Sequence, residues 1–181
     1  TATLFKRYNQ FDFVAGEKII AFDNYAQDEL GQPPVKWNYE GNAEIVQLTN
    51  ATDKFVAISG QYSMFHLDYI KSLPVNFTLE FNLAVDENYK GNGFKLFFLH
   101  RAKETYHANN PFNTSSTNHP NGRFELDLSP INGNKGTGRL YYAYNYGGNT
   151  VSNSDYDFPY FTAKKNNKVR VSIWRQNQRL R

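Results

Sequence analysis

The sequence predicts an all-β fold, specifically a jelly-roll β-sandwich of two antiparallel sheets. Three observations support this prediction. Eight short segments alternate apolar and polar residues, no segment sustains the three-to-four-residue apolar period of a helix, and the chain is rich in residues typical of strands and polar loops, with 13 Tyr, 15 Phe and 22 Asn. A length of 181 residues suits a single domain, so we expect one β-sandwich domain over residues 1–181.

The clearest expected strand is NFTLEFNLAV at residues 76–85, in which every second side chain is apolar. This period of two places one face against a core and the other in water. Shorter segments of the same kind predict strands at 17–23, 43–48, 54–60, 93–100, 122–129, 139–146 and 168–174. Gly, Asn, Pro and Asp separate most of them, as expected for turns between antiparallel strands.

Three segments, 107–122, 131–138 and 145–157, are rich in Asn, Gly and Ser and are expected to be loops. They are either solvated connectors or, because loops on a rigid sandwich often carry binding residues, part of a binding surface. The last residues, 170–181, resemble a strand without a following turn. We therefore expect a fragment of a longer chain, with the sandwich truncated at its C-terminus.

Several classes of function are disfavoured by composition. The net charge of +3 lacks the dense basic clustering expected of a nucleic-acid partner. No apolar run reaches the roughly 18 residues of a membrane-spanning helix. Cysteine is absent and the four histidines show no paired metal spacing, so we expect no bound cofactor, with Ca²⁺ as the one alternative considered below.

The segment GRFELDLS at residues 122–129 contains two acids separated by one residue. Because side chains alternate along a strand, Glu125, Asp127 and Ser129 share one face while the apolar residues between them face a core. Two interpretations remain open: the acids are ordinary residues on the solvent side of a sheet, or they contact a bound sugar.

The same residues resemble the E-x-D-x-E signature of laminarinase-type glycoside hydrolases, in the concanavalin A-like lectin/glucanase superfamily. That resemblance implies Glu125 as the nucleophile and Asp127 as its supporting acid, with Ser129 where the acid/base Glu should stand. A hydroxyl is too weak an acid to protonate the leaving oxygen, and losing a general acid costs about 10²–10⁴ in rate. We therefore expect no catalysis.

A second resemblance covers residues 11–48, with later support at 73–83 and 168–181. These segments resemble the concanavalin A-like (laminin G-like) domain found ahead of OmpA-type peptidoglycan-binding domains in envelope proteins of the Bacteroidetes. The matching positions are Phe13, Gly16, Phe22, Asp23, Asp28, Gly31, Pro34 and Trp37. The resemblance implies an exported protein of the periplasm, outer membrane or cell surface of a Gram-negative bacterium, with an OmpA-type domain in the same full-length chain.

Five further residues are candidates for binding. Tyr142 and Tyr144 share one face of an expected strand, where they either stack on sugar rings or fill the core. Trp174 lies opposite the apolar face of its strand and is a candidate for an exposed sugar-stacking platform. Asp23 and Asp28 are weak candidates for Ca²⁺, an ion that prefers oxygen ligands.

Together these features favour a non-catalytic module of the cell envelope that binds carbohydrate or another surface component through a concave sheet face. Two alternatives from other classes stay open. One is a purely structural spacer that binds nothing, and the other is a divergent laminarinase-type hydrolase using Glu125 and Asp127.

Overall fold

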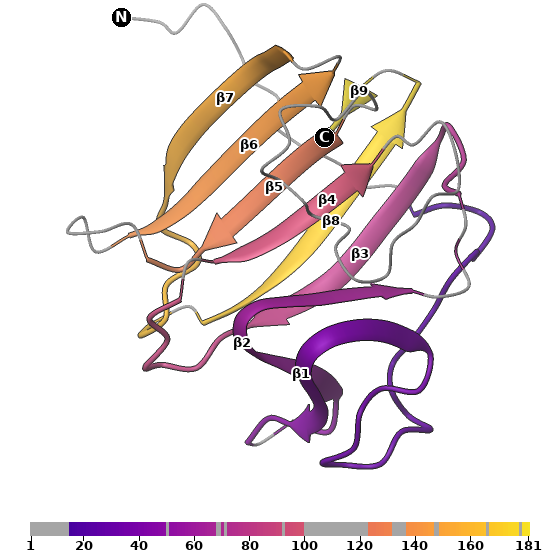
Figure 1. The fold of residues 1–181 in the computed structure, drawn as a ribbon, viewed down its shortest axis with the longest axis vertical. Helices are drawn as coiled ribbons and strands as arrows, with labels where there is room; N and C mark the ends of the chain where they lie inside the picture. Colours follow the sequence, from indigo (N-terminus) through magenta and orange to yellow (C-terminus); the bar gives the residue numbers. More distant parts are fainter. Residues whose placement is uncertain are drawn as a thin grey trace, which may run out of the picture. The chain divides into compact units, whose positions relative to one another are not determined.

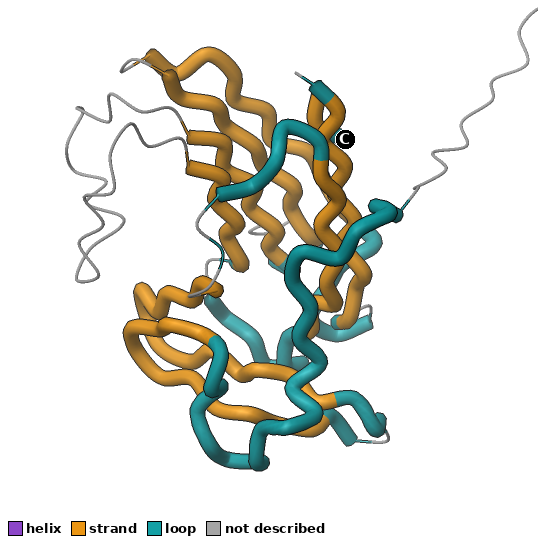
Figure 2. The backbone as a smooth tube through the Cα atoms, turned by 90° about the vertical axis from the view of Figure 1, so that its right-hand side faces the viewer, coloured by secondary structure: helices purple, strands orange, loops and turns teal. Residues whose placement is uncertain are grey.

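The computed structural model describes residues 15–49, 51–67, 70, 72–91, 93–99, 123–131, 137–146, 149–165, 167–177 and 179–181. These residues contain strands and loops and no helix, as Figure 2 shows. The strands are β1 Trp37–Gln47, β2 Lys54–Leu67, β3 Phe77–Ala84, β4 Phe94–Leu99, β5 Arg123–Ser129, β6 Gly138–Tyr146, β7 Asn149–Phe158, β8 Lys168–Gln176 and β9 Arg179–Leu180.

The strands form three sheets, ordered β1-β2, β3-β8-β9 and β4-β5-β6-β7 (Figure 1). Every pair of strands whose register is defined is antiparallel. The predicted all-β class is confirmed, with the antiparallel sheets of a β-sandwich protein. In the described part of the chain, no helix has the length and apolar character needed to cross a membrane.

The four-stranded sheet is a simple meander, because each strand pairs with the next one along the chain. Its register sorts side chains onto two faces. Leu128 of β5 pairs with Phe94 of β4 and Leu140 of β6, whereas the next position, Asp127, pairs with Lys95. One face is therefore apolar and the other carries charges, since neighbouring positions on a strand point to opposite sides.

The β1-β2 hairpin organises the segment that precedes it. Gly31 N–H donates to the carbonyl of Ile45, and Ile45 N–H donates back to the carbonyl of Gln32, with N···O distances of 2.8 Å for each. Ile45 is 1% exposed. Gly31 has φ of +77°, a left-handed conformation that glycine adopts without steric cost. Gly31 therefore forms part of a turn before β1.

Contacts within the chain define two compact units, one of Thr1–Leu79 with Ser172–Arg181 and the other of Glu80–Val171. β3 and β8 each run from one unit into the other. Ile45 and Ile173 are buried in the first unit, and Leu128, Phe161 and Ala163 in the second. The prediction of one domain over residues 1–181 stays a prediction.

Two of the predictions of secondary structure are wrong. Residues 17–23 are not a strand, and their apolar side chains Ile19, Ile20 and Phe22 are 77%, 47% and 67% exposed. Residues 145–157 are not a loop, because most of them belong to β7, which pairs with β6 along its length. β7 forms despite its polar sequence since a neighbouring strand satisfies its backbone groups, whereas 17–23 has no such neighbour among the described residues.

The other expected strands are confirmed, several with extended bounds; β1 begins at Trp37, and β2 runs to Leu67. The predicted loop at 107–122 lies outside the described residues. Near the C-terminus, β8 is followed by the short strand β9, and Trp174 and Arg181 exchange backbone hydrogen bonds of 2.9 and 2.8 Å.

Gly138, the first residue of β6, provides a test of packing. A Cβ at this position would overlap the carbonyl oxygen of Phe161 and lie 2.6 Å from that of Phe158. Backbone oxygens cannot rotate away, so Gly138→Ala should lower the free energy of unfolding by about 3 kcal/mol or more. Gly31→Ala is the control, because nothing lies within 4 Å of its added Cβ, and should cost only the backbone strain of about 1–2 kcal/mol. Denaturant unfolding measures both; equal costs would contradict the packing at Gly138.

Candidate functional site

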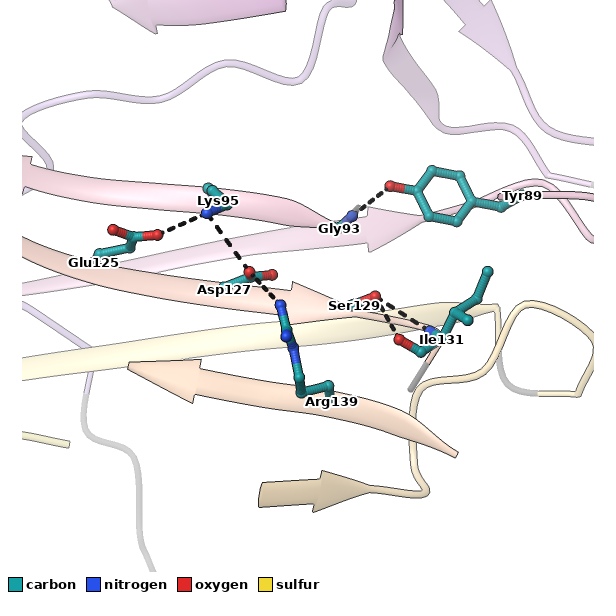
Figure 3. A network of polar contacts seen from close by, with 8 residues as sticks. All are labelled: Tyr89, Gly93, Lys95, Glu125, Asp127, Ser129, Ile131 and Arg139. Atoms are coloured by element: carbon teal, nitrogen blue, oxygen red, sulfur yellow. Dashed lines mark hydrogen bonds and ion pairs between the residues drawn. The ribbon is translucent and has the colours of Figure 1, made fainter. Parts of the chain in front are cut away.

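Four charged side chains meet on the polar face of the β4-β5-β6-β7 sheet (Figure 3). Glu125 and Asp127 belong to β5, Lys95 to β4 and Arg139 to β6. Lys95 lies directly opposite Asp127 in the register, and Arg139 is one diagonal step away, opposite Ser129. Long side chains bridge both spacings in an antiparallel sheet, so the strand register by itself brings the four groups together.

The contacts within this cluster are short. Lys95 Nζ lies 2.9 Å from Glu125 Oε1 and 3.8 Å from Asp127 Oδ2, and Arg139 Nη2 lies 2.9 Å from Asp127 Oδ2. The acids are buried and the bases are not: the side chains of Glu125 and Asp127 are 8% and 2% exposed, against 46% for Lys95 and 33% for Arg139. The cations therefore cover the carboxylates.

Of the two interpretations of Glu125 and Asp127, the one that makes them ordinary residues on the solvent side of a sheet is wrong. The two residues are 6% and 1% exposed, and Ser129 is 3% exposed. A lone strand with alternating polarity predicts a wet polar face, but here the basic groups of Lys95 and Arg139 from the flanking strands contact the buried acids. On the other face, Leu128 is buried as predicted, while Phe124 and Leu126 are half-buried.

Ser129 is engaged in a local turn. Its Oγ donates to the carbonyl of Ile131 at 2.9 Å and accepts from the Ile131 N–H at 3.3 Å. Such hydroxyl-to-backbone pairs stabilise turns, and here one fixes the exit of the chain from β5. The hydroxyl is committed to this role at the position where the hydrolase signature has its acid/base residue.

Asp127 is also enclosed from the side of β4. Gly93, with φ of +107°, lies so close that an added Cβ would stand 2.6 Å from Asp127 Oδ1. The Gly93 N–H donates to the hydroxyl of Tyr89 at 2.8 Å, which holds this backbone in place. Oδ1 itself is buried and has no hydrogen-bond partner in the described part of the chain.

Burial raises the pKa of the Asp127 carboxyl above its ordinary value of 3.8. The nearby cations Lys95 and Arg139 act in the opposite direction, and the negative charge of Glu125 adds to the rise. The loss of water around a carboxylate that is 1% exposed outweighs the two cations.

This geometry does not suit glycoside hydrolysis. A retaining mechanism needs an accessible nucleophilic carboxylate and a carboxylic acid roughly 5 Å away that donates a proton. Glu125 is buried under the Lys95 ammonium, and Ser129 supplies no acid. What the arrangement does instead is join three adjacent strands through ion pairs.

Tyr142 and Tyr144 lie in β6, where their backbones pair with Leu126 and Phe124. Their side chains lie outside what the structure describes, so the two predictions for them stay open. Trp174 in β8 is half-buried rather than an open platform, and the guanidinium of Arg181 stands 5.8 Å from the centre of its ring. One face of the indole is therefore occupied by a cation–π contact.

Asp23 and Asp28 are both used to fold the segment before β1. Asp23 Oδ1 accepts from the Tyr25 N–H at 3.0 Å, and its Oδ2 accepts from the indole N–H of Trp37 at 3.0 Å. Asp28 Oδ1 accepts from the Val35 N–H at 2.9 Å. No group of three or more acidic, His or Cys side chains suited to a metal occurs among the described residues.

Sequence reasoning missed Lys95 and Arg139, the residues that neutralise the acids. A signal for them was present, because each is an isolated basic residue in a largely apolar strand and those strands flank the acidic one along the chain. A meander of three such strands would have predicted the cluster.

No protein-family model, curated protein or solved structure matches this chain.

The ion pair of Arg139 with Asp127 can be measured by a double-mutant cycle. Arg139→Met leaves a buried carboxylate with less compensation and should cost about 2–4 kcal/mol of unfolding free energy, somewhat less than for a fully buried pair because Arg139 is partly exposed. Adding Asp127→Asn removes the charge and should recover at least half of that loss. Arg170→Met is the control: its partner Glu80 is 29% exposed, and the loss should stay below about 1 kcal/mol. Additive losses at 139 and 127 would contradict the pairing.

The raised pKa of Asp127 predicts a pH dependence of stability. The folded state holds the proton more tightly than the unfolded chain, so this stabilisation is fully present below the unfolded pKa of about 3.9 and is lost as pH rises through the folded pKa. The unfolding free energy of the native chain minus that of Asp127→Asn should therefore fall as pH is raised above about 4. Urea titrations at closely spaced pH values measure this difference in unfolding free energy. A difference that grows with pH would show that the cations, and not burial, dominate the pKa of Asp127.

Proposed function

We propose that this chain is a non-catalytic module that binds carbohydrate or another component of a cell surface. The non-catalytic part of this proposal is supported by the burial and bonding of the polar side chains of β5. Glu125 and Asp127 are buried beneath Lys95 and Arg139, and the hydroxyl of Ser129 is bound to Ile131. Catalytic carboxylates have to reach the substrate, whereas the carboxylates of Glu125 and Asp127 are buried in ion pairs between strands.

The resemblance of residues 11–48 to the concanavalin A-like domain of envelope proteins supports the rest of the proposal. That resemblance implies an exported protein of a Gram-negative bacterium, in the periplasm, outer membrane or cell surface, with an OmpA-type domain in the same full-length protein. A β-sandwich of this kind binds its ligand through a sheet face and the loops beside it.

The geometry also favours a second candidate, a structural spacer. The residues that the sequence offers for sugar binding are partly used inside the molecule: Glu125 and Asp127 in ion pairs, and one face of Trp174 by Arg181. Tyr142, Tyr144 and Trp174 stay candidates for a binding face. The two functions differ in whether any ligand binds.

A binding experiment separates these functions. The full chain is titrated calorimetrically with soluble oligosaccharides of β-glucan, chitin and peptidoglycan. A binding module should give a measurable dissociation constant for at least one of them, and Tyr144→Ala or Trp174→Ala should weaken binding about tenfold or more, as expected for an aromatic residue central to an interface.

Tyr160→Ala is the matched control, because this tyrosine is 72% exposed and is not among the proposed binding residues. Binding unchanged in all three variants would remove these aromatics from the site, and silence across the panel would favour the spacer. Reducing-sugar release that disappears in Glu125→Gln would overturn the non-catalytic assignment.

A further inference from the structure

The turn at residues 23–28 arranges two backbone carbonyl oxygens around a cation. Lys54 Nζ donates to the carbonyl of Asp28 at 2.6 Å and to that of Ala26 at 3.2 Å. Lys54 is the first residue of β2 and reaches a turn that lies 26 to 28 residues earlier in the chain. The ammonium and the turn are thus brought together by tertiary structure.

The turn is fixed independently of Lys54. Asp23 Oδ1 accepts from the N–H of Tyr25, and Asn24 Oδ1 accepts from the N–H of Ala26, which makes two successive side-chain-to-backbone turns. Asp28 N–H donates to the carbonyl of Tyr25, a residue with φ of +55°. These contacts engage the N–H groups of the turn and leave the carbonyls of residues 26 and 28 on the side of Lys54.

Converging carbonyl oxygens create a negative potential that favours a cation, as in sites where backbone carbonyls replace a hydration shell. We propose that the carbonyls of Ala26 and Asp28 form a binding site for a primary ammonium ion, which the chain fills with its own Lys54. A free alkylammonium ion takes this place when the Lys54 side chain is shortened.

The donor set fits an ammonium ion better than calcium. Ca²⁺ takes six to eight oxygen ligands, whereas an ammonium group needs only one acceptor for each N–H. The nearby carboxylates of Asp23 and Asp28 already accept N–H groups from Tyr25, Trp37 and Val35. The acidic residues of this turn suggested a bound Ca²⁺, but the cation at the turn is the ammonium group of Lys54.

Chemical rescue of Lys54→Ala tests the proposal. Propylammonium restores the atoms that this substitution removes. The substitution should lower the melting temperature by about 5 °C, since it removes a charge-assisted contact to two acceptors. Propylammonium chloride should restore at least half of that loss, with the melting temperature rising with the logarithm of its concentration. Sodium chloride, calcium chloride and tetramethylammonium chloride at equal ionic strength should not.

Two variants control for non-specific effects. Lys36→Ala removes a lysine of the same segment, whose Nζ lies 3.7 Å from Asp23 Oδ1 and whose side chain is 48% exposed. It should change the melting temperature little and show no rescue. Lys54→Met keeps an apolar stem in the path to the carbonyls, so it should be destabilised and stay so in propylammonium.

Three results would overturn the proposal: a melting temperature of Lys54→Ala within about 1 °C of the native value, equal rescue by sodium chloride, or equal rescue of Lys36→Ala or Lys54→Met. If Lys54→Ala does not fold, its refolding yield in propylammonium becomes the measurement. Recovery of folded protein then supports the site. If propylammonium recovers no folded Lys54→Ala and Lys54→Gln is as stable as the native chain, the proposed ammonium site is rejected.

Discussion

The four-stranded sheet depends on the neutralisation of two carboxylates that a single strand carries into its interior. Moving a carboxylate out of water costs several kcal/mol unless a cation and hydrogen bonds compensate it. β5 has two such groups, Glu125 and Asp127, and the strands on either side each supply one base, Lys95 and Arg139. The requirement fixes register as well as charge, because a shift of one residue would turn both acids to the apolar face.

In the segment before β1, too, polar atoms have their partners inside the chain. The carboxylates of Asp23 and Asp28 accept backbone and indole N–H groups, and the carbonyls of Ala26 and Asp28 accept from Lys54. In both places the ligand of an acidic or oxygen-rich cluster is a basic side chain from a neighbouring strand. Both clusters are held together by contacts within the chain.

This distinction decides how the acidic strand is understood. Two acids and a hydroxyl at alternate positions have the spacing of a hydrolase strand, but spacing says nothing about access or charge compensation. Burial, two covering cations and the local hydrogen bonds of Ser129 give the strand a structural role. The aromatic candidates for binding a ligand, Tyr142, Tyr144 and Trp174, belong to β6 and β8.

The sequence by itself determined the fold class, most of the strands and the two faces of β5, because alternation with a period of two is a local property that any pairing of the strands preserves. It also determined that position 129 has no acid. Only the tertiary structure decided that β7 is a strand, that residues 17–23 are not, and that the acids are covered, since each depends on a neighbour distant along the chain. A strand is completed by its partner's hydrogen bonds, and a carboxylate's environment is set by the strands beside it, so neither follows from one segment alone.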